Sequence, residues 1–216
     1  MRTLLLIPAF NEARTIGELV AAAKTYIPDV LVLDDGSSDG TAAAAAGAIV
    51  HRHETNRGKG AALKTGFNYA LDHSYDWVIT MDADGQHDPH DLAAFLPLSD
   101  RFDLILGNRM EERARVPWVR RLSNMSASFI VSTLSGQTIL DSQTGFRAYS
   151  AALLRAVRLH CSHYDLETEV IVKAARQGFR IGHVRIQTIY AGEVSRFRNL
   201  KDSLRFLAVA GRLLFR

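Results

Sequence analysis

Two aspartates stand two positions apart in the segment from Asp82 to Gln86, directly after an apolar run. In an extended chain, side chains two positions apart point to the same side. The carboxylates of Asp82 and Asp84 would then point the same way, and Gln86 adds a third oxygen after the turn at Gly85. Such hard oxygen ligands suit Mg²⁺ or Mn²⁺. These ions keep several waters and bridge to substrate phosphates, so a few protein ligands would suffice. The segment is therefore a candidate metal site.

A structural role for this segment stays open beside the metal site. Asp84 and Asp88 could shape a turn and cap a helix that begins at Pro89. His87 and His90 lack a recognisable zinc-ligand spacing, and we expect them at the surface.

Two further polar segments follow apolar runs. In residues 32–41, VLDDGSSDGT, turn formation and helix capping are the expected roles for three of the four residues Asp34, Ser37, Ser38 and Asp39. Residues 56–66, NRGKGAALKTG, are rich in glycine ahead of a predicted helix, which suits a phosphate. They do not form a Walker A loop, and no G-x-G-x-x-G follows the first predicted strand. These observations favour a mononucleotide and metal site over a P-loop or a dinucleotide site.

The elements that must position these segments alternate between strand and helix. We expect strands at residues 3–8, 29–33, 48–51, 77–81 and 104–107, with helices between them that include 15–25 and 41–46. Thr15 and Glu18 form a capping-box pattern. The alternation predicts an α/β fold, with a parallel sheet covered by helices on both faces. Ligands of such sheets bind beyond the carboxyl ends of the strands, where the polar segments fall.

The composition narrows the class of protein. A chain of 216 residues that is 47% hydrophobic can bury a sizeable core as one large domain or as one domain with an appendage. The net charge of +3 is weaker than that of a dedicated nucleic-acid binder, so no nucleic acid partner is expected. The lone Cys161 and the lack of a targeting pattern at the N-terminus favour the cytoplasm.

Six segments taken together resemble the family 2 nucleotide-sugar glycosyltransferases of the GT-A fold, and among them the dolichyl- and polyprenyl-phosphate sugar synthases. They run in order between about Leu4 and Phe197, as IPAFNEARTI, VLDDGSSDGT, NRGKGAALKTGF, MDADGQHDP, DSQTGFRAY and LETEVIVKAARQGFRIGHVRI. The resemblance implies a GT-A domain over residues 1–197, with a mostly parallel, Rossmann-like nucleotide-binding sheet flanked by helices. It also implies transfer of a sugar, with inversion, from a GDP- or UDP-linked donor to an acceptor. A polyprenyl or dolichyl phosphate is the acceptor that it favours.

The resemblance assigns residues to the donor. It implies that the nucleotide pocket is formed by Pro8, Asn11, Glu12, Asp35, Lys59 and Asp82, with Asp35 at the edge of the base. Asp82, Asp84 and Gln86 match the metal motif of the family, with Mg²⁺ or Mn²⁺ as cofactor. The turn after Leu33 would then hold the nucleoside.

It also assigns a catalytic acid. Asp141 stands at the position of an acid that precedes a T-G-F-R segment, where it would orient or deprotonate the acceptor or position the sugar. The alternative is that Asp141 holds Arg147 in place. Glu167 opens a predicted helix, where an acid favours the helix dipole without any catalytic role, and both interpretations of it stay open.

Cations complete the expected site. Arg109 and Arg120 match arginines that bind the acceptor phosphate in the related synthases, and a guanidinium fork suits phosphate geometry. Ser195 and Arg196 would lie near the donor diphosphate, although many relatives have lysine where this chain has Arg196.

The C-terminal segment bears on the membrane. Residues 198–216 are predicted to form an amphipathic helix that either lies in a bilayer interface or packs on the domain. Neither 117–135 nor 201–215 reaches the roughly 18 uninterrupted apolar residues of a spanning helix. Relatives with polyprenyl acceptors often carry added spanning helices. We therefore expect a peripheral enzyme at the cytoplasmic face, docking on a membrane partner protein.

Three alternative functions remain. A saccharide or another hydroxyl group could be the acceptor. A sugar-1-phosphate nucleotidyltransferase would share nucleotide, metal and sheet, but it would carry a glycine-rich loop where this chain has PAFNEA. A non-catalytic, membrane-associated subunit would bind nucleotide without turnover.

Overall fold

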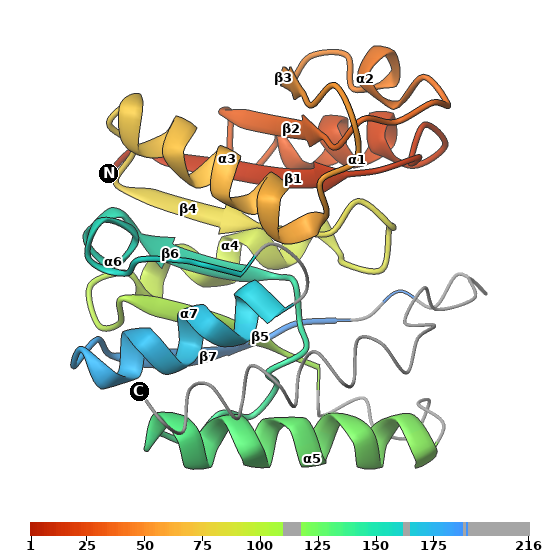
Figure 1. Ribbon diagram of the computed structural model, residues 1–216. Coiled ribbons are helices and arrows are strands. Elements are labelled where there is room, and N and C mark those ends of the chain that lie inside the picture. Colours follow the sequence, from red (N-terminus) through yellow and green to blue (C-terminus); the bar gives the residue numbers. More distant parts are fainter. Residues whose placement is uncertain (110–117, 162–164, 188, 190–216) are drawn as a thin grey trace.

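A mixed sheet forms the centre of the protein in the computed structural model, which describes residues 1–109, 118–161, 165–187 and 189 (Figure 1). The strand order is β3-β2-β1-β4-β6-β5-β7. The strands are β1 (Thr3–Ala9), β2 (Val30–Asp34), β3 (Ile49–Arg52), β4 (Trp77–Thr80), β5 (Leu104–Asn108), β6 (Arg147–Ser150) and β7 (Ile181–Arg185). Among the strands that the structure describes, only β6 runs antiparallel to its neighbours, β4 and β5. The predicted α/β fold with a mostly parallel sheet is confirmed.

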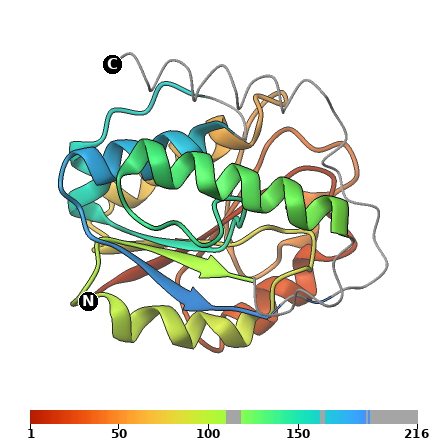
Figure 2. The same cartoon turned by 90° about the horizontal axis from the view of Figure 1, so that it is seen from below.

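Helices cover both faces of this sheet. They are α1 (Ile16–Ala23), α2 (Thr41–Ala44), α3 (Lys59–Asp72), α4 (Leu92–Phe95), α5 (Trp118–Ser135), α6 (Ala151–Ala156) and α7 (Asp165–Arg176), with the 3₁₀ turns η1 (Pro89–Asp91) and η2 (Leu96–Leu98). Figures 1 and 2 show α3, α6 and α7 on one face, with α5 beyond α7, and α1 and α4 on the other. The sheet is thus the middle layer of three.

The sequence of β1 explains why both faces are covered. Leu4 and Leu6 point into the core beneath α3 and α7, whereas Leu5 and Ile7 point into the core beneath α1 and α4. All four side chains are fully buried. A parallel strand that is buried on both faces reads as a continuous apolar run rather than an alternating one. This is why TLLLIP marks a central strand.

The expected elements of the first half are present with small shifts at their ends. The helix predicted at 41–46 ends at Ala44, and the capping box at Thr15 does not form. Thr15 has helical backbone angles, and its hydroxyl donates to the carbonyl of Ala83 at 2.7 Å. The N-terminus of α1 is thereby tied to the loop after β4. The sequence did not indicate β6 or β7.

Some expectations fall on residues outside this description. Ser195, Arg196 and the segment 198–216 lie there, so their roles and the boundary at residue 197 stay predictions. Arg120 lies in α5, but the structure describes only its backbone. Among the residues that are described, no helix has both the length and the apolar character that crossing a membrane requires.

Candidate active site

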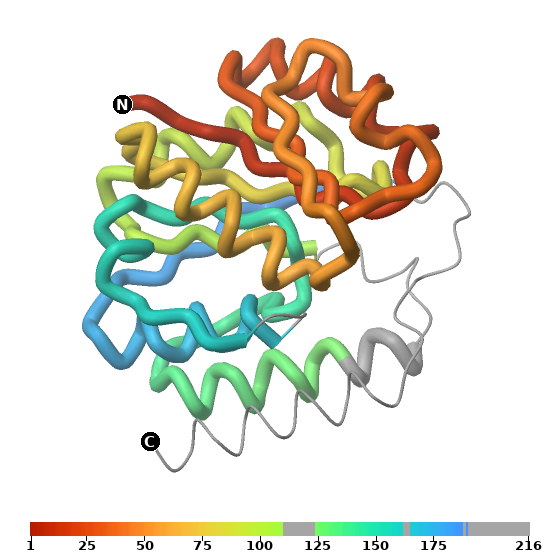
Figure 3. Tube along the Cα trace, turned by 45° about the horizontal axis from the view of Figure 1, so that its top comes forward, coloured from red at the N-terminus to blue at the C-terminus, as the bar shows by residue number. Residues whose placement is uncertain are grey.

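The polar loops meet at one edge of the sheet. Strands β1, β2 and β4 are parallel neighbours, so the loops after them lie together at the carboxyl edge (Figure 3). Hydrogen bonds join the first two loops directly. The backbone N–H of Asn11 donates to Ser37 Oγ, that of Ser38 donates to Asn11 Oδ1, and that of Glu12 donates to Thr41 Oγ1, each at 2.9 Å. Asn11 has a positive φ of 56°, which asparagine tolerates better than most residues. The predicted pocket residues Asn11 and Glu12 are therefore held by the turn after β2.

The polar residues of the turn after β2 make mostly structural contacts. The sequence predicted such roles for three of the four residues Asp34, Ser37, Ser38 and Asp39. Asp34 Oδ1 accepts from the backbone N–H of Ser37 at 2.9 Å. Asp39 accepts from the Thr41 hydroxyl and from the N–H of Ala13, and the bond to the Thr41 hydroxyl is the main cause that lowers the pKa of Asp39. These bonds fix the shape of the turn.

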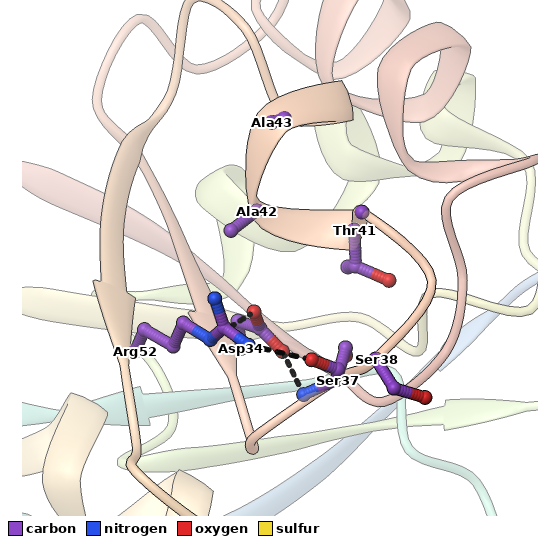
Figure 4. A pocket seen from close by; sticks show the side chains of 8 residues that line it. Asp34, Ser37, Ser38, Thr41, Ala42, Ala43 and Arg52 are labelled. Atoms are coloured by element: carbon purple, nitrogen blue, oxygen red, sulfur yellow. Dashed lines mark hydrogen bonds and ion pairs between the residues drawn. The ribbon is translucent and has the colours of Figure 1, made fainter.

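A small pocket of about 290 Å³ lies beside this turn, against α2 and β3 (Figure 4). The carboxylate of Asp34 lies 3.3 Å from Arg52 Nε, and Arg52 Nη2 donates to the carbonyl of Ser37 at 2.6 Å. Asp34 and Arg52 thus form an ion pair in this pocket, although Asp34 Oδ2 is buried without a hydrogen-bond partner.

Asp35 connects the turn to the glycine-rich loop. Its buried carboxylate lies 2.7 Å from His53 Nδ1 and accepts from the N–H groups of Arg57 and Gly58 at 3.0 and 2.8 Å. At the neighbouring Gly36, φ is +77° and an added Cβ would come within 2.6 Å of the Thr55 backbone. Only glycine permits this close approach. Asp35 therefore braces the loop that leads into α3, and its contact with a base stays a prediction.

Asp82 lies in an ion-pair cluster with Lys59. Lys59 Nζ is 2.6 Å from Asp82 Oδ1 and 3.3 Å from Glu167 Oε1. Burial by itself would raise the pKa of Asp82, but the charge of Lys59 and the contact with His87 hold that pKa well below its usual range. Burial would likewise lower the pKa of Lys59, and Asp82 and Glu167 raise it instead. Asp82 is an ionised carboxylate with a cation already beside it.

His87 is not the surface residue that the sequence predicted. Its side chain is 3% exposed, its ring packs against Phe146, and its Nε2 lies 3.7 Å from Asp82 Oδ2. The ring is buried because it packs against Phe146, which belongs to the apolar core beneath α1 and α4. Nδ1 of His87 is buried without a hydrogen-bond partner. His90 is exposed as expected.

The carboxylate of Asp84 is a candidate ligand for a divalent cation. Burial is the main cause that raises its pKa, and the charge of Asp82 raises it further. Its Oδ1 accepts from the backbone N–H of Gln86 at 3.0 Å. A divalent cation would relieve the repulsion between these two carboxylates. The described part of the chain holds no cluster of three or more His, Cys, Asp or Glu that could by itself hold a metal ion.

Gly145 shapes the floor of the acidic cluster, and sequence reasoning did not single it out. The hydroxyl of Thr80 in β4 donates to the carbonyl of Gly145 at 2.8 Å. A Cβ at position 145 would come within 2.5 Å of the carboxylate carbon of Asp82. The glycine of the T-G-F-R segment is therefore needed because Asp82 lies against it.

Arg147 of the same segment holds the loop from inside. It is fully buried and donates to the carbonyls of Thr144, Glu167 and Ser142 at 2.7, 2.8 and 2.9 Å. Its hydrogen bonds go to backbone carbonyls and its ion-pair partner is Glu167, so the alternative in which Asp141 holds Arg147 is wrong. Arg147 instead joins the loop before β6 to the first turn of α7.

Asp141 pairs with Arg109, a contact that the sequence did not indicate. Arg109 Nε lies 2.8 Å from Asp141 Oδ2, and Arg109 Nη2 lies 3.2 Å from Oδ1. Burial would raise the pKa of Asp141, but the guanidinium of Arg109 holds it below its usual range. The N–H of Gln143 also donates to Oδ1 at 3.0 Å. Asp141 is therefore ionised, with both oxygens engaged.

His183 supports the same loop from β7 and gives a pH test. Its Nε2 accepts from the N–H of Leu140 at 3.2 Å, and burial lowers its pKa, although the charge of Asp141 opposes this. Below about pH 6.5 the unfolded chain gains a proton that the folded chain resists, so stability falls as the pH falls. His183→Gln keeps an acceptor but does not titrate. Urea unfolding at pH 7.5 and 5.5 should show a smaller loss of stability in this variant than in the wild type.

The exposed His90 provides a control for the substitution itself, because His90→Gln makes the same chemical change at the surface, away from the loop that His183 supports. An equal loss of stability in wild type and His183→Gln would contradict the conclusion that burial lowers the pKa of His183.

Known proteins are similar to this chain in sequence and in fold. The family model of glycosyl transferase family 2 matches residues 5–159. The UDP-N-acetylglucosamine–dolichyl-phosphate N-acetylglucosaminyltransferase of Methanococcus voltae is 31% identical, over 86% of this chain and 85% of its own. The undecaprenyl-phosphate mannosyltransferase of Micrococcus luteus is 33% identical, over 86% of this chain and 83% of its own.

A solved structure shows the same fold. The glucosyl-3-phosphoglycerate synthase of Mycobacterium tuberculosis, in complex with Mn²⁺, UDP and phosphoglyceric acid, has a TM-score of 0.75 at 21% identity. The similarity covers 99% of this chain and 76% of that one. Since the family model spans most of the chain, and relatives above 30% identity cover most of it again, the protein is a glycosyltransferase that belongs to glycosyl transferase family 2.

Proposed function

We propose that this glycosyltransferase moves a sugar from a nucleoside diphosphate to a polyprenyl phosphate, with inversion and with Mg²⁺ or Mn²⁺. The observation that carries the choice of acceptor is the ionised Asp141, whose two oxygens are engaged by Arg109. A hydroxyl acceptor needs a base that removes its proton, whereas a phosphate monoester is already anionic at neutral pH and needs positioning. An acid whose pKa is lowered by an arginine suits positioning better than proton removal.

The donor belongs at the carboxyl edge, between the loops after β1, β2 and β4. Pro8, Asn11 and Glu12 would line the nucleoside, and the loop braced by Asp35 would face its base. Asp82 and Asp84, with Gln86, would hold the divalent cation. When bound, the cation neutralises charge that develops on the leaving diphosphate.

The acceptor phosphate belongs beside Arg109, whose side chain is 23% exposed and is fixed by the buried Asp141. A fixed guanidinium can bind phosphate through two parallel hydrogen bonds. In this arrangement a phosphate oxygen attacks the anomeric carbon from the face opposite the diphosphate. We place Arg120 with Arg109, and Ser195 and Arg196 at the diphosphate, on the sequence resemblance.

The names of two relatives support this acceptor, because one acts on a dolichyl phosphate and the other on an undecaprenyl phosphate. Those names also agree with the proposed class of donor, since the first relative uses UDP-N-acetylglucosamine.

Replacing Arg109 tests the acceptor assignment. We expect Arg109→Lys to raise the KM for polyprenyl phosphate by roughly 10- to 100-fold, because the bidentate fork is lost while the charge beside Asp141 is kept. The donor KM should change by less than about threefold. Arg120→Lys should act in the same direction. Steady-state kinetics with each substrate varied in turn provide the measurement.

The exposed Arg101 offers a control on the same protein, since Arg101→Lys should leave both KM values unchanged. If Arg109→Lys raised both KM values equally, Arg109 would not be an acceptor residue.

A further inference from the structure

Lys59 joins three separate parts of the site. It is the first residue of α3, Asp82 lies in the loop after β4, and Glu167 lies in the first turn of α7. The Lys59 ammonium is 2.6 Å from the Asp82 carboxylate and 3.3 Å from the Glu167 carboxylate, and the Lys59 side chain is only 16% exposed. One cation is therefore shared by two carboxylates that are 85 residues apart in the sequence.

The two carboxylates differ in their surroundings. Asp82 lies against Gly145, and its charge raises the pKa of Asp84, the other carboxylate of the proposed metal site. Glu167 is 7% exposed, its backbone carbonyl accepts from Arg147, and its carboxylate lies 4.0 Å from Arg147 Nε. Glu167 is thus fixed by α7 and by the buried arginine, wherever the lysine ammonium points.

An ammonium and a divalent cation compete for one carboxylate. Both are attracted to Asp82, and they repel each other at short range where water is scarce. A long lysine side chain can move its ammonium by changing rotamer while its backbone stays in the helix. The second carboxylate, already 3.3 Å away, gives the ammonium a partner that is not part of the proposed metal site.

We propose that Lys59 is a tethered counter-ion which neutralises Asp82 before the metal binds, and that Glu167 receives the Lys59 ammonium when Asp82 turns to the metal. This inference rests on the metal site of the proposed function. It assigns Glu167, whose role the sequence left open, to positioning Lys59. The pair then sets the affinity for the metal and keeps the site from holding an uncompensated group of carboxylates.

The affinity for Mn²⁺ tests this role without any turnover. Free Mn²⁺ is measured by electron paramagnetic resonance during titration of the full chain, once without nucleotide and once with UDP. We expect Lys59→Gln to lower the dissociation constant of Mn²⁺ by roughly tenfold, because the competing cation is gone. Glu167→Gln should raise it by roughly threefold, because the ammonium then loses the Glu167 carboxylate and competes more strongly for Asp82.

The double variant separates the lysine from a general charge effect. If Glu167 acts through Lys59, Lys59→Gln with Glu167→Gln should bind Mn²⁺ about as tightly as Lys59→Gln alone. If Glu167 only adds negative charge, its replacement should weaken binding at least as much without the lysine as with it. Lys59→Arg keeps the positive charge and should keep the wild-type affinity for Mn²⁺. It serves as a second variant at this position in case Lys59→Gln does not fold. Lys64→Gln removes one positive charge from the same helix and should also leave the affinity unchanged.

The outcomes distinguish the two proposals. If the wild type binds Mn²⁺ and folded Lys59→Gln binds it no more tightly, the role of Lys59 is overturned while the metal site stands. If the wild type binds no Mn²⁺ with or without UDP, the proposed metal site itself is wrong.

Discussion

Asp84→Asn is expected to lower kcat/KM for sugar transfer by at least about a thousandfold, because a neutral amide is a weaker ligand than a carboxylate for the proposed cation, which would offset charge on the leaving diphosphate. The variant should fold normally. Its Oδ1 can still accept from the N–H of Gln86, and the substitution removes a carboxylate whose pKa is raised by burial and by Asp82. A group with a raised pKa destabilises the folded state when it is ionised, so the metal-free variant should have a Tm equal to or above that of the wild type at neutral pH.

Asp88 offers a matched control four residues along the same loop. Its carboxylate accepts from the N–H of His90 at 2.9 Å and caps the turn η1. Asp88→Asn makes the same chemical change without touching the acidic cluster, and should retain most of the activity. Substantial turnover by Asp84→Asn, measured with the wild-type donor and metal, would remove Asp84 from the metal site.

Arg147→Met is expected to cost roughly 3–5 kcal/mol of stability, because it leaves three buried carbonyls without their donor. For a chain of this length that loss corresponds to a fall in Tm of roughly 10 °C. The loop before β6 and the first turn of α7 should also separate. Activity should therefore be reduced even at temperatures well below the Tm of the variant, where the protein is still folded. Differential scanning calorimetry and activity measured 20 °C below the Tm of the variant provide the two readouts.

The exposed Arg155 on α6 is the control for this substitution. Arg155→Met removes the same side chain from the surface and should change the stability by less than about 0.5 kcal/mol. An equally small effect at position 147 would show that the buried arginine does not hold the loop.

The sequence predicts those features that depend on neighbouring residues. The apolar run of β1 indicated a central strand, and the spacing of Asp82 and Asp84 indicated a shared carboxylate site. Alternation of strands and helices gave the parallel part of the sheet, and hence the edge where the loops gather. These inferences need only the local period of the chain and the geometry of parallel strands.

Features that depend on distant partners could not be derived in this way. Nothing in the local sequence indicates that Arg147 would be fully buried against backbone carbonyls, or that Asp141 would pair with Arg109 instead. The antiparallel strand β6 is only four residues long, and it pairs with β4 and β5, which are distant from it in the sequence. Side-chain reach and loop packing decide such contacts, and residue spacing carries little information about either.

The most direct test of the central claim is to identify the product. The purified protein is incubated with Mg²⁺ or Mn²⁺, a mixture of UDP- and GDP-sugars and a short polyprenyl phosphate. The molecular masses of the lipids are then measured by mass spectrometry. We predict a new lipid-phosphate sugar, and omission of single donors would then identify the nucleotide. An unmodified lipid while the donor is consumed would contradict the polyprenyl phosphate acceptor.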